Sequence, residues 1–427
     1  MSDNKTTKDM YMVYVNEDVA LVPTFGVGDQ GTYTTPLFIA DASANKKQFP
    51  APAGDMTMPW EQPLKESERN INKDANGVDL CLAGREYTDG KLSMKCQDAQ
   101  FIAFPFQGET YLEGTVDLSA GHDFSSANHK FQVDGTEVTL TANCANLPAI
   151  ITEINLQMKT LGIYHVQARV SQAKYVALIS RAAVIAAGTS VDFLTVAGIT
   201  AGNIFGASTV MGSNLPSIAI NWADPTDTTK GIESYGCYTK DSELKFASSD
   251  KYVTQDITLG HYKTSAFADN GSIVIHTVNQ GFMSRSLANP LRIGQIAITV
   301  NGHAQKVVGF SFKVENEVDD DLVINSEYRP NANLKSRNVT FELDLKDSTT
   351  TSPATYMGYT RATTITLVPI VITMSFTGRS ATMTRTLTLT NMYCKTFEGP
   401  IEIPQEAGFK RYKASFEMGS GFTIALT

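Results

Sequence analysis

The stretch Asn338-Val339-Thr340-Phe341-Glu342-Leu343-Asp344-Leu345-Lys346 decides the fold class. Its odd-numbered positions are apolar, and its even-numbered positions are polar or charged. Successive side chains of a β-strand point to opposite faces, so this pattern predicts a strand with one buried face. Similar runs rich in Val, Ile, Thr, Tyr and Phe recur along most of the 427 residues. The expected fold is therefore mainly β, a β-sandwich or barrel framework.

A hairpin is predicted upstream of this stretch. Alternation over Ile296–Val300 is followed by Asn301-Gly302, and the chain returns through Val307 to Phe310–Val314. Asn-Gly favours the positive φ angles of a two-residue type I′ turn. The two runs are therefore expected to pair with each other.

A small α+β module is predicted in the first half of the chain. Phe131–Val133 and Thr136–Thr141 flank a second turn signal, Asp134-Gly135, and strands resume at Tyr164–Val170 and Lys174–Ser180. The segment between the two pairs of strands has the spacing of an amphipathic helix. Its apolar stripe consists of Leu147, Ile150, Ile151, Ile154, Met158 and Leu161.

The ends of this helix carry the expected signals. Asn146 is the predicted N-cap, Pro148 lies in the first turn where its missing N–H costs nothing, and Gly162 suits the left-handed position after the last turn. The module is predicted to span residues 117–222. It interrupts a β framework whose two parts are residues 1–116 and 223–427.

Three stretches rich in turn residues predict excursions from this framework: residues 40–70, Asp224–Asp227 and Asp347–Pro353. The run Ala362–Phe376 has two interpretations. It is one long strand of about 50 Å with Pro369 at an edge or a bulge, or it is two ordinary strands broken at Pro369.

The composition excludes several classes of protein. Lys and Arg number 35 against 44 Asp and Glu, a formal net charge of −9, and 42% of the residues are hydrophobic, which excludes wholesale disorder. An acidic chain lacks the clustered cations that tight binding to a phosphate backbone requires. The polar start Met1–Asp9 predicts no signal peptide, and no run approaches the roughly 18 apolar residues of a spanning helix, so no membrane contact is expected.

The cysteines indicate reduced, packed thiols of a protein made in a cytoplasm. They are odd in number and contain no C-x-x-C pair, which argues against a disulfide framework and against a structural zinc site. The five are Cys81, Cys96, Cys144, Cys237 and Cys394.

The motifs that could carry chemistry are weak. Gly26–Gly31 matches G-x-G-x-x-G, but Thr32–Pro36 follows it in place of the helix that a dinucleotide site needs. The sequon at Asn338 lies in the predicted strand, and we discount it. The histidines are scattered at His122, His129, His165, His261, His276 and His303.

One acidic cluster could hold a hard cation or supply a hydrolase with a carboxylate pair, although it lacks the spacing of an EF-hand, and a solvated turn is the simpler interpretation. Its members are Glu315, Glu317, Asp319, Asp320 and Asp321. Because no nucleophile is paired with a base, we assign no catalytic, cofactor-binding or metal-binding residue, and we expect a protein that is not an enzyme.

Several segments resemble the tail tube proteins of tailed bacteriophages. Val307–Glu317 and Asn338–Leu345 are similar to the strand–turn–strand core of that family, and Gly84–Lys95 is similar to its early strand element. Arg385–Lys395, Phe397–Pro400 and Tyr412–Met418 are similar to its closing strands. Residues 131–180 resemble a small α+β module found in flagellar hook-region proteins and phage virion proteins. The family's usual tube domain is shorter than this chain, which requires the inserted module.

The resemblance implies a structural virion protein of the phage tail, assembled in the bacterial host cytoplasm. Its partners would be further copies of itself in rings stacked into a tube, and other tail proteins such as the tape measure, the terminator or the baseplate. DNA would pass through the tube without tight binding, and an acidic subunit suits such a conduit because like charges do not hold the phosphate backbone. The alternative is a capsid decoration or another surface-binding module of a virion, with residues 117–222 projecting toward a partner or glycan.

Overall fold

The computed structural model describes residues 11–16, 47–68, 80–127, 129–224, 227–247, 249–264, 276–277, 288–319, 333–347, 357–359, 365–398 and 410–427. Strands make up 60% of the structure and helices 10%, which confirms the expected mainly β class. Within these ranges, no helix combines the length and the apolar character needed to cross a membrane.

One antiparallel sheet, which has sixteen strands in the described ranges, dominates the fold. Its main path is β2 (Lys47–Gln48), β1 (Tyr11–Asn16), β17 (Ser217–Asp224), β18 (Asp227–Phe246), β24 (Val307–Asp319), β25 (Asn333–Asp347), β28 (Lys410–Leu426), β27 (Met383–Glu398), β26 (Leu367–Phe376), β22 (Ile296–Val300) and β23 (His303–Ala304). Its branches are β19 (Thr254–Gly260), β6 (Gly90–Lys95), β3 (Pro52–Thr57), β20 (Lys263–Thr264) and β21 (His276–Thr277). A 3₁₀ turn, η4 (Ile293–Gln295), precedes β22.

The decisive stretch forms the second half of β25, and its alternation is confirmed. Val339, Phe341 and Leu343 are buried. Phe341 pairs with Phe312 of β24 on one side and with Phe416 of β28 on the other. Inward-facing side chains from β18, β22 and β24 to β28 form one hydrophobic core. Burying each large apolar side chain contributes about 1.5–3 kcal/mol, so this core is the main source of stability.

The Asn301-Gly302 turn is confirmed, but the strand expected to return from it is not. Both residues have positive φ, 50° and 77°. After the turn, only the two residues of β23 pair with β22. One further hydrogen bond, from the Gln305 amide to the Ile298 carbonyl, ends this ladder. The long run that follows is β24, which pairs with β18 and β25. The Asn-Gly pair fixed the turn but not the strand after it; the opposite edge of β22 pairs with β26.

The C-terminal run contains a ten-residue strand, β26, with a bulge. The ladder with β27 shifts register between Val368 and Ile370, which places Pro369 at the bulge. Pro369 still accepts a hydrogen bond at its carbonyl from the Asn301 amide, at 2.8 Å. The run is not broken into two strands at Pro369, because β26 continues through the bulge. One strand over the whole run is not formed either, since β26 starts only at Leu367 and residues 365–366 lie outside it; residues 362–364 are outside the described part.

The α+β module has a hydrophobic core of its own. Its strands are β7 (Thr110–Glu113), β8 (His122–Asp123), β9 (His129–Val133), β10 (Thr136–Leu140), β11 (Asn143–Cys144), β12 (Val166–Ser171), β13 (Tyr175–Ser180), β14 (Ala182–Ala187), β15 (Val191–Asp192) and β16 (Gly202–Phe205). Its helices are α3 (Leu147–Thr160) and α4 (Phe193–Ala197). The β9–β10 hairpin, helix α3 and the β12–β13 pair match the sequence prediction, whereas the strands and the helix after residue 181 had not been predicted.

Helix α3 begins and ends as its sequence predicts. The side chain of Asn146 accepts a hydrogen bond from the Ala149 amide at 2.9 Å, and Gly162 has a φ of 66°. Asn155 fixes the helix to β12, since its side-chain amide exchanges two 2.9 Å hydrogen bonds with the backbone of Ala168.

The chain enters and leaves the module at one point. Gly108 donates its amide to the carbonyl of Ala207 at 3.2 Å, and Gln107 forms a bridge with Ser208. Strand β7, before residue 117, pairs with β13 of the module, and β17, which spans residue 222, pairs with β1 and β18 of the large sheet. By backbone pairing, the module comprises residues 109–206. It therefore starts before the predicted limit of residue 117 and ends before the predicted limit of residue 222. That residues 117–222 are a module inserted into one β domain, formed by residues 1–116 and 223–427, stays a prediction.

Short helix α2 (Ala99–Ala103) lies where the module meets the β framework. Asp98 caps it by accepting the Gln100 amide at 3.0 Å. Ile102 packs in the main core, whereas Phe101 packs in a smaller core with Tyr14.

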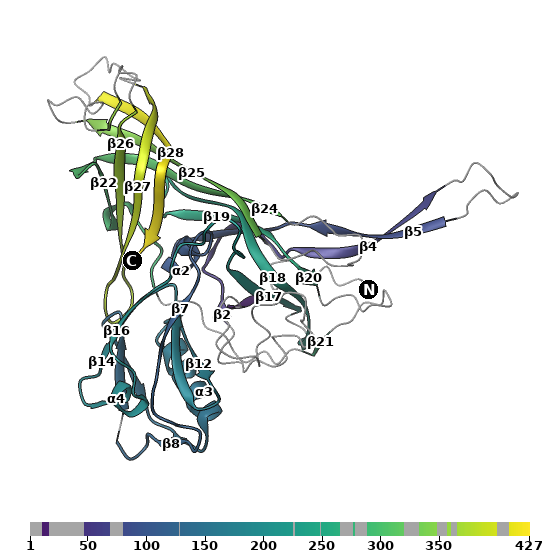
Figure 1. Ribbon diagram of the computed structural model, residues 1–427, viewed down its shortest axis with the longest axis vertical. Helices are drawn as coiled ribbons and strands as arrows, with labels where there is room; N and C mark the ends of the chain where they lie inside the picture. The colour runs from purple at the N-terminus through teal and green to yellow at the C-terminus, as the bar shows by residue number, and fades with distance from the viewer. Residues whose placement is uncertain are drawn as a thin grey trace, which may run out of the picture.

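The stretch 40–70 was expected to be a loop, but its described part contains strands. After β2 and β3, β4 (Trp60–Glu68) and β5 (Leu80–Thr88) form a two-stranded sheet of their own. Figure 1 shows this arm extending away from the rest of the molecule. Pro63 lies in an edge strand, because β4 has no second partner strand among the described residues, and edge strands are where proline is tolerated in a sheet.

Candidate functional site

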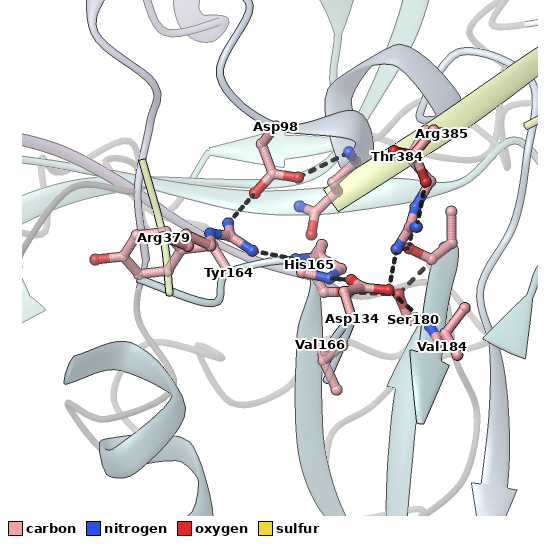
Figure 2. A network of polar contacts seen from close by, with 12 residues as sticks. Asp98, Asp134, Tyr164, His165, Val166, Ser180, Val184, Arg379, Thr384 and Arg385 are labelled. Atoms are coloured by element: carbon pink, nitrogen blue, oxygen red, sulfur yellow. Dashed lines mark hydrogen bonds and ion pairs between the residues drawn. The ribbon is translucent and has the colours of Figure 1, made fainter. Parts of the chain in front are cut away.

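The most unusual feature of the structure is a group of charged side chains buried where the module meets the large sheet. We call Asp98, Asp134, His165, Arg379 and Arg385 the polar seam (Figure 2). Asp134 and His165 come from the module, Arg379 precedes β27, Arg385 lies in β27, and Asp98 caps α2. All five are almost fully buried.

Asp134 is the centre of the polar seam. It lies in the β9–β10 turn at a φ of 50°, a conformation that Asp tolerates better than most residues. One carboxylate oxygen accepts from the guanidinium of Arg385 at 2.6 Å and from the Val184 amide at 2.9 Å, and the other contacts His165. Burial opposes ionisation, but the contacts with His165 and Arg385 outweigh it and hold the pKa of Asp134 well below its usual range.

His165 is held in one tautomer by its two neighbours. Burial lowers its pKa, so the imidazole is neutral at pH 7 although Asp134 opposes this shift. Arg379 can only donate, and its Nη1 lies 3.4 Å from Nδ1 of the ring. The ring proton is therefore on Nε2, which donates to Asp134. Arg379 also lies 3.9 Å from the free carboxylate oxygen of Asp98.

Arg385 closes the polar seam from the side of the large sheet. Its guanidinium donates to the carbonyl of Ala182 at 3.0 and 2.8 Å and to that of Thr384 at 2.8 Å, besides its bond to Asp134. The sequence contained a signal that we did not use. Met383, Arg385, Leu387 and Leu389 occupy alternate, inward-facing positions, and an arginine in such a series needs a buried acceptor.

A second buried cluster lies beside the polar seam. Arg181 forms an ion pair with Glu109 at 3.2 Å, and its guanidinium lies 5.1 Å from the ring centre of Phe104. Asn16 of β1 donates to Glu109 at 2.6 Å. Lys47 of β2 donates to two module carbonyls, and burial lowers its pKa to about 8. These contacts join the first strands of the chain to the module.

Gln107 completes the junction at the point of insertion. Its side-chain amide donates to the carbonyl of Arg181 at 2.7 Å and exchanges hydrogen bonds with the backbone of Leu426 at 3.1 and 3.0 Å. The last strand of the chain is thereby tied to the base of the module.

The polar seam is suited to holding the module in one orientation and not to catalysis. Both ring nitrogens of His165 are used in structural contacts, and Ser180 donates to the backbone carbonyl of His165 and not to its ring. No group of three or more His, Cys, Asp or Glu side chains in the described ranges is positioned to hold a metal ion.

The other histidines have separate positions. His122 and His129 lie together at the outer end of the module, with their Nε2 atoms 3.4 Å apart. His261 is buried against the ring of Tyr87, His276 lies in β21, and His303 is exposed in β23. Gly26–Gly31 lies outside the described residues.

The described part of the acidic cluster does not converge on one point. Glu315 pairs with Lys313 and accepts from Asn338, Glu317 accepts from Ser336, and Asp319 lies 3.3 Å from Lys335. These three carboxylates follow one another along β24 with different partners, which is the behaviour of a solvated strand face. Asp320 and Asp321 lie outside the described residues.

The cysteines whose side chains are described are free thiols. Cys96, Cys144 and Cys237 are buried, and Cys394 is partly buried. Burial raises the pKa of Cys96 and of Cys394, the latter to about 12, so neither is a reactive thiolate at neutral pH.

Comparison with known proteins adds no relative to this geometry. No model of a known protein family matches the chain, and no curated protein matches it.

Proposed function

We propose that this chain is a structural virion protein, a subunit that assembles with further copies of itself into the stacked rings of a phage tail tube. It acts by assembly and not by catalysis, and its module is an insertion fixed to the β framework. The observation that carries the proposal is the β4–β5 arm.

The arm supports assembly because of its size and its unpaired outer edges. Nine residue pairs, from Trp60↔Thr88 to Glu68↔Leu80, form its ladder. At about 3.3 Å per residue, such a ribbon is roughly 30 Å long. Neither outer edge pairs with another strand of the described chain. A single hairpin is marginally stable in water, so an arm of this length gains stability when another molecule covers it.

The large sheet and the net charge support the same proposal. Most of the segments that resemble tail tube proteins form neighbouring strands: Val307–Glu317 in β24, Asn338–Leu345 in β25, Arg385–Lys395 in β27 and Tyr412–Met418 in β28. Gly84–Lys95 lies apart from them, in β5 and β6. A net charge of −9 suits a wall past which DNA slides.

The experiment shortens the arm without touching either core. Glu61 and Tyr87 are paired in register, so residues 62–86 can be replaced by an Asn-Gly turn joining them. The matched control replaces residues Asn301-Gly302 by Asp-Gly, which keeps the turn type. We expect the shortened variant to keep its circular dichroism spectrum and to sediment as a monomer where the control and the wild type form large assemblies. If the shortened variant assembles like the wild type, the arm does not carry the proposal.

The alternative function is a surface module of a virion that binds a partner or a glycan. The separate core of the module favours it, as do the exposed Leu156, Val191 and Tyr111 on its surface. Excision of residues 109–206 distinguishes the two functions. The ends to be joined, Gly108 and Ala207, are hydrogen-bonded to each other, so a short glycine linker can close the cut. A tube subunit assembles after the excision, whereas a binding module loses its ligand.

A further inference from the structure

The two histidines at the outer end of the module form an arrangement that neither the fold nor the proposed function requires. His122 lies in β8, and His129 is the first residue of β9. The ring of Phe124 lies between the strands and contacts both imidazoles, with centroid separations of 4.8 and 5.1 Å. Phe193 of α4 packs behind Phe124 at 5.8 Å, so an aromatic wall holds the pair in place.

The contact between the two rings is a poor hydrogen bond. Their Nε2 atoms are 3.4 Å apart, longer than the roughly 2.7–3.2 Å of a good N–H bond to an acceptor. Only 6% of the surface of His129 is exposed, and its Nδ1 has no hydrogen-bond partner in the described part of the chain. The protein therefore buries an imidazole and gives it one long polar contact.

The same distance fits two ligands of one metal ion. Zinc binds imidazole nitrogen at about 2.0–2.1 Å, and tetrahedral angles then place two nitrogens about 3.3–3.4 Å apart. We propose that His122 and His129 bind a divalent transition-metal ion, such as Zn²⁺, through their Nε2 atoms. The described ranges bring no third His, Cys, Asp or Glu to the ion, so water fills its other positions.

The surroundings decide which cations this site takes and how they reach it. His122 is partly exposed, which gives an ion a route from solvent. Asp123 is exposed next to His122, where its carboxylate accepts from the Ser125 amide at 2.9 Å, and its charge attracts cations to the mouth of the site. Cys144 lies opposite His122 in the ladder, but its thiol contacts the carbonyl of Ala142. Imidazole ligands favour Zn²⁺, Cu²⁺ and Ni²⁺ over the oxygen-seeking Mg²⁺ and Ca²⁺.

Titration calorimetry of the full chain with Zn²⁺ tests this site. We expect a saturable Zn²⁺ site that His122→Ala weakens at least tenfold, and that weakens as the pH falls from 7.5 to 5.5, because protons compete for the imidazoles. His129→Gln should weaken it equally. The matched control is His303→Ala, which removes a lone exposed imidazole in β23 and should leave the affinity unchanged.

Two results would overturn the proposal. One is the absence of saturable Zn²⁺ binding to the wild type up to about 1 mM. The other is an affinity that survives His122→Ala in protein with an unchanged circular dichroism spectrum. Because His122 is partly exposed, its variant folds even if the buried His129 variant does not, so the test does not depend on the latter. Assembly into rings is measured in a separate experiment, so a chain that does not assemble would leave the zinc-binding result unaffected.

Discussion

Removing Arg385 tests whether the polar seam holds the module on the large sheet. Arg385→Met keeps the length and the apolar part of the side chain but removes a guanidinium that is 3% exposed. It leaves the buried carboxylate of Asp134 without its 2.6 Å ion pair and the carbonyl of Ala182 without two donors. Removing one partner of a buried pair costs about 3–5 kcal/mol, so we expect a loss of that size in the free energy of unfolding.

The companion variants separate the ion pair from the loss of packing. Asp134→Asn keeps the turn, because Asn tolerates the same positive φ. The double variant should lose less than the sum of the single losses, by about 1–3 kcal/mol, because the two side chains interact directly. Lys395→Met is the control. Its ion pair with Glu417 is exposed, at 55% and 26% of the two side chains, and exposed pairs contribute about 0–1 kcal/mol.

The assay is chemical denaturation followed by near-ultraviolet circular dichroism at low protein concentration. A loss below about 1 kcal/mol for Arg385→Met, or strict additivity in the double variant, would refute the claim that this ion pair anchors the module.

Three further predictions concern the module. Ile154→Ala should lower the free energy of unfolding by about 2–5 kcal/mol, because Ile154 is fully buried in α3. Leu156→Ala, at an exposed position of the same helix, should lower it little. Equal losses in chemical denaturation would contradict the assignment of the buried and exposed faces. The folded pKa of His165 is lowered, so the unfolded chain binds the additional proton, and stability present above about pH 6.5 is lost as the pH falls toward 5. His165→Gln should flatten that part of the stability-against-pH curve, and an unchanged slope would show that His165 is not its source. Gly206→Ala should destabilise the junction, since the added Cβ would lie 1.7 Å from the Gly108 carbonyl oxygen; melting temperatures equal to the wild type would contradict the close approach.

Local signals in the sequence predicted local structure well. The alternation of β25, both two-residue turns, and the N-cap and C-terminal glycine of α3 depend on neighbours in the chain, and all are confirmed. The pairing of strands was less predictable. β24 was expected beside β22, because the Asn-Gly turn precedes it, but the order in a sheet depends on which distant edges compete.

The polar seam could not be assembled from the sequence, for the same reason. Its members are up to 287 positions apart, from Asp98 to Arg385, and only the fold brings them together. Asp134 was identified only as a turn residue. Its carboxylate gained a second role because the turn that it forms meets β27. The inward-facing position of Arg385 was the one local sign of that contact.

Negative-stain electron microscopy of the purified full chain over a range of concentrations tests the assembly proposal most directly. The proposal predicts hollow rings that stack into tubes, with the arms absent from the outer rim because neighbouring copies cover them. A particle that stays monomeric at every concentration, with the arm standing free, would contradict it.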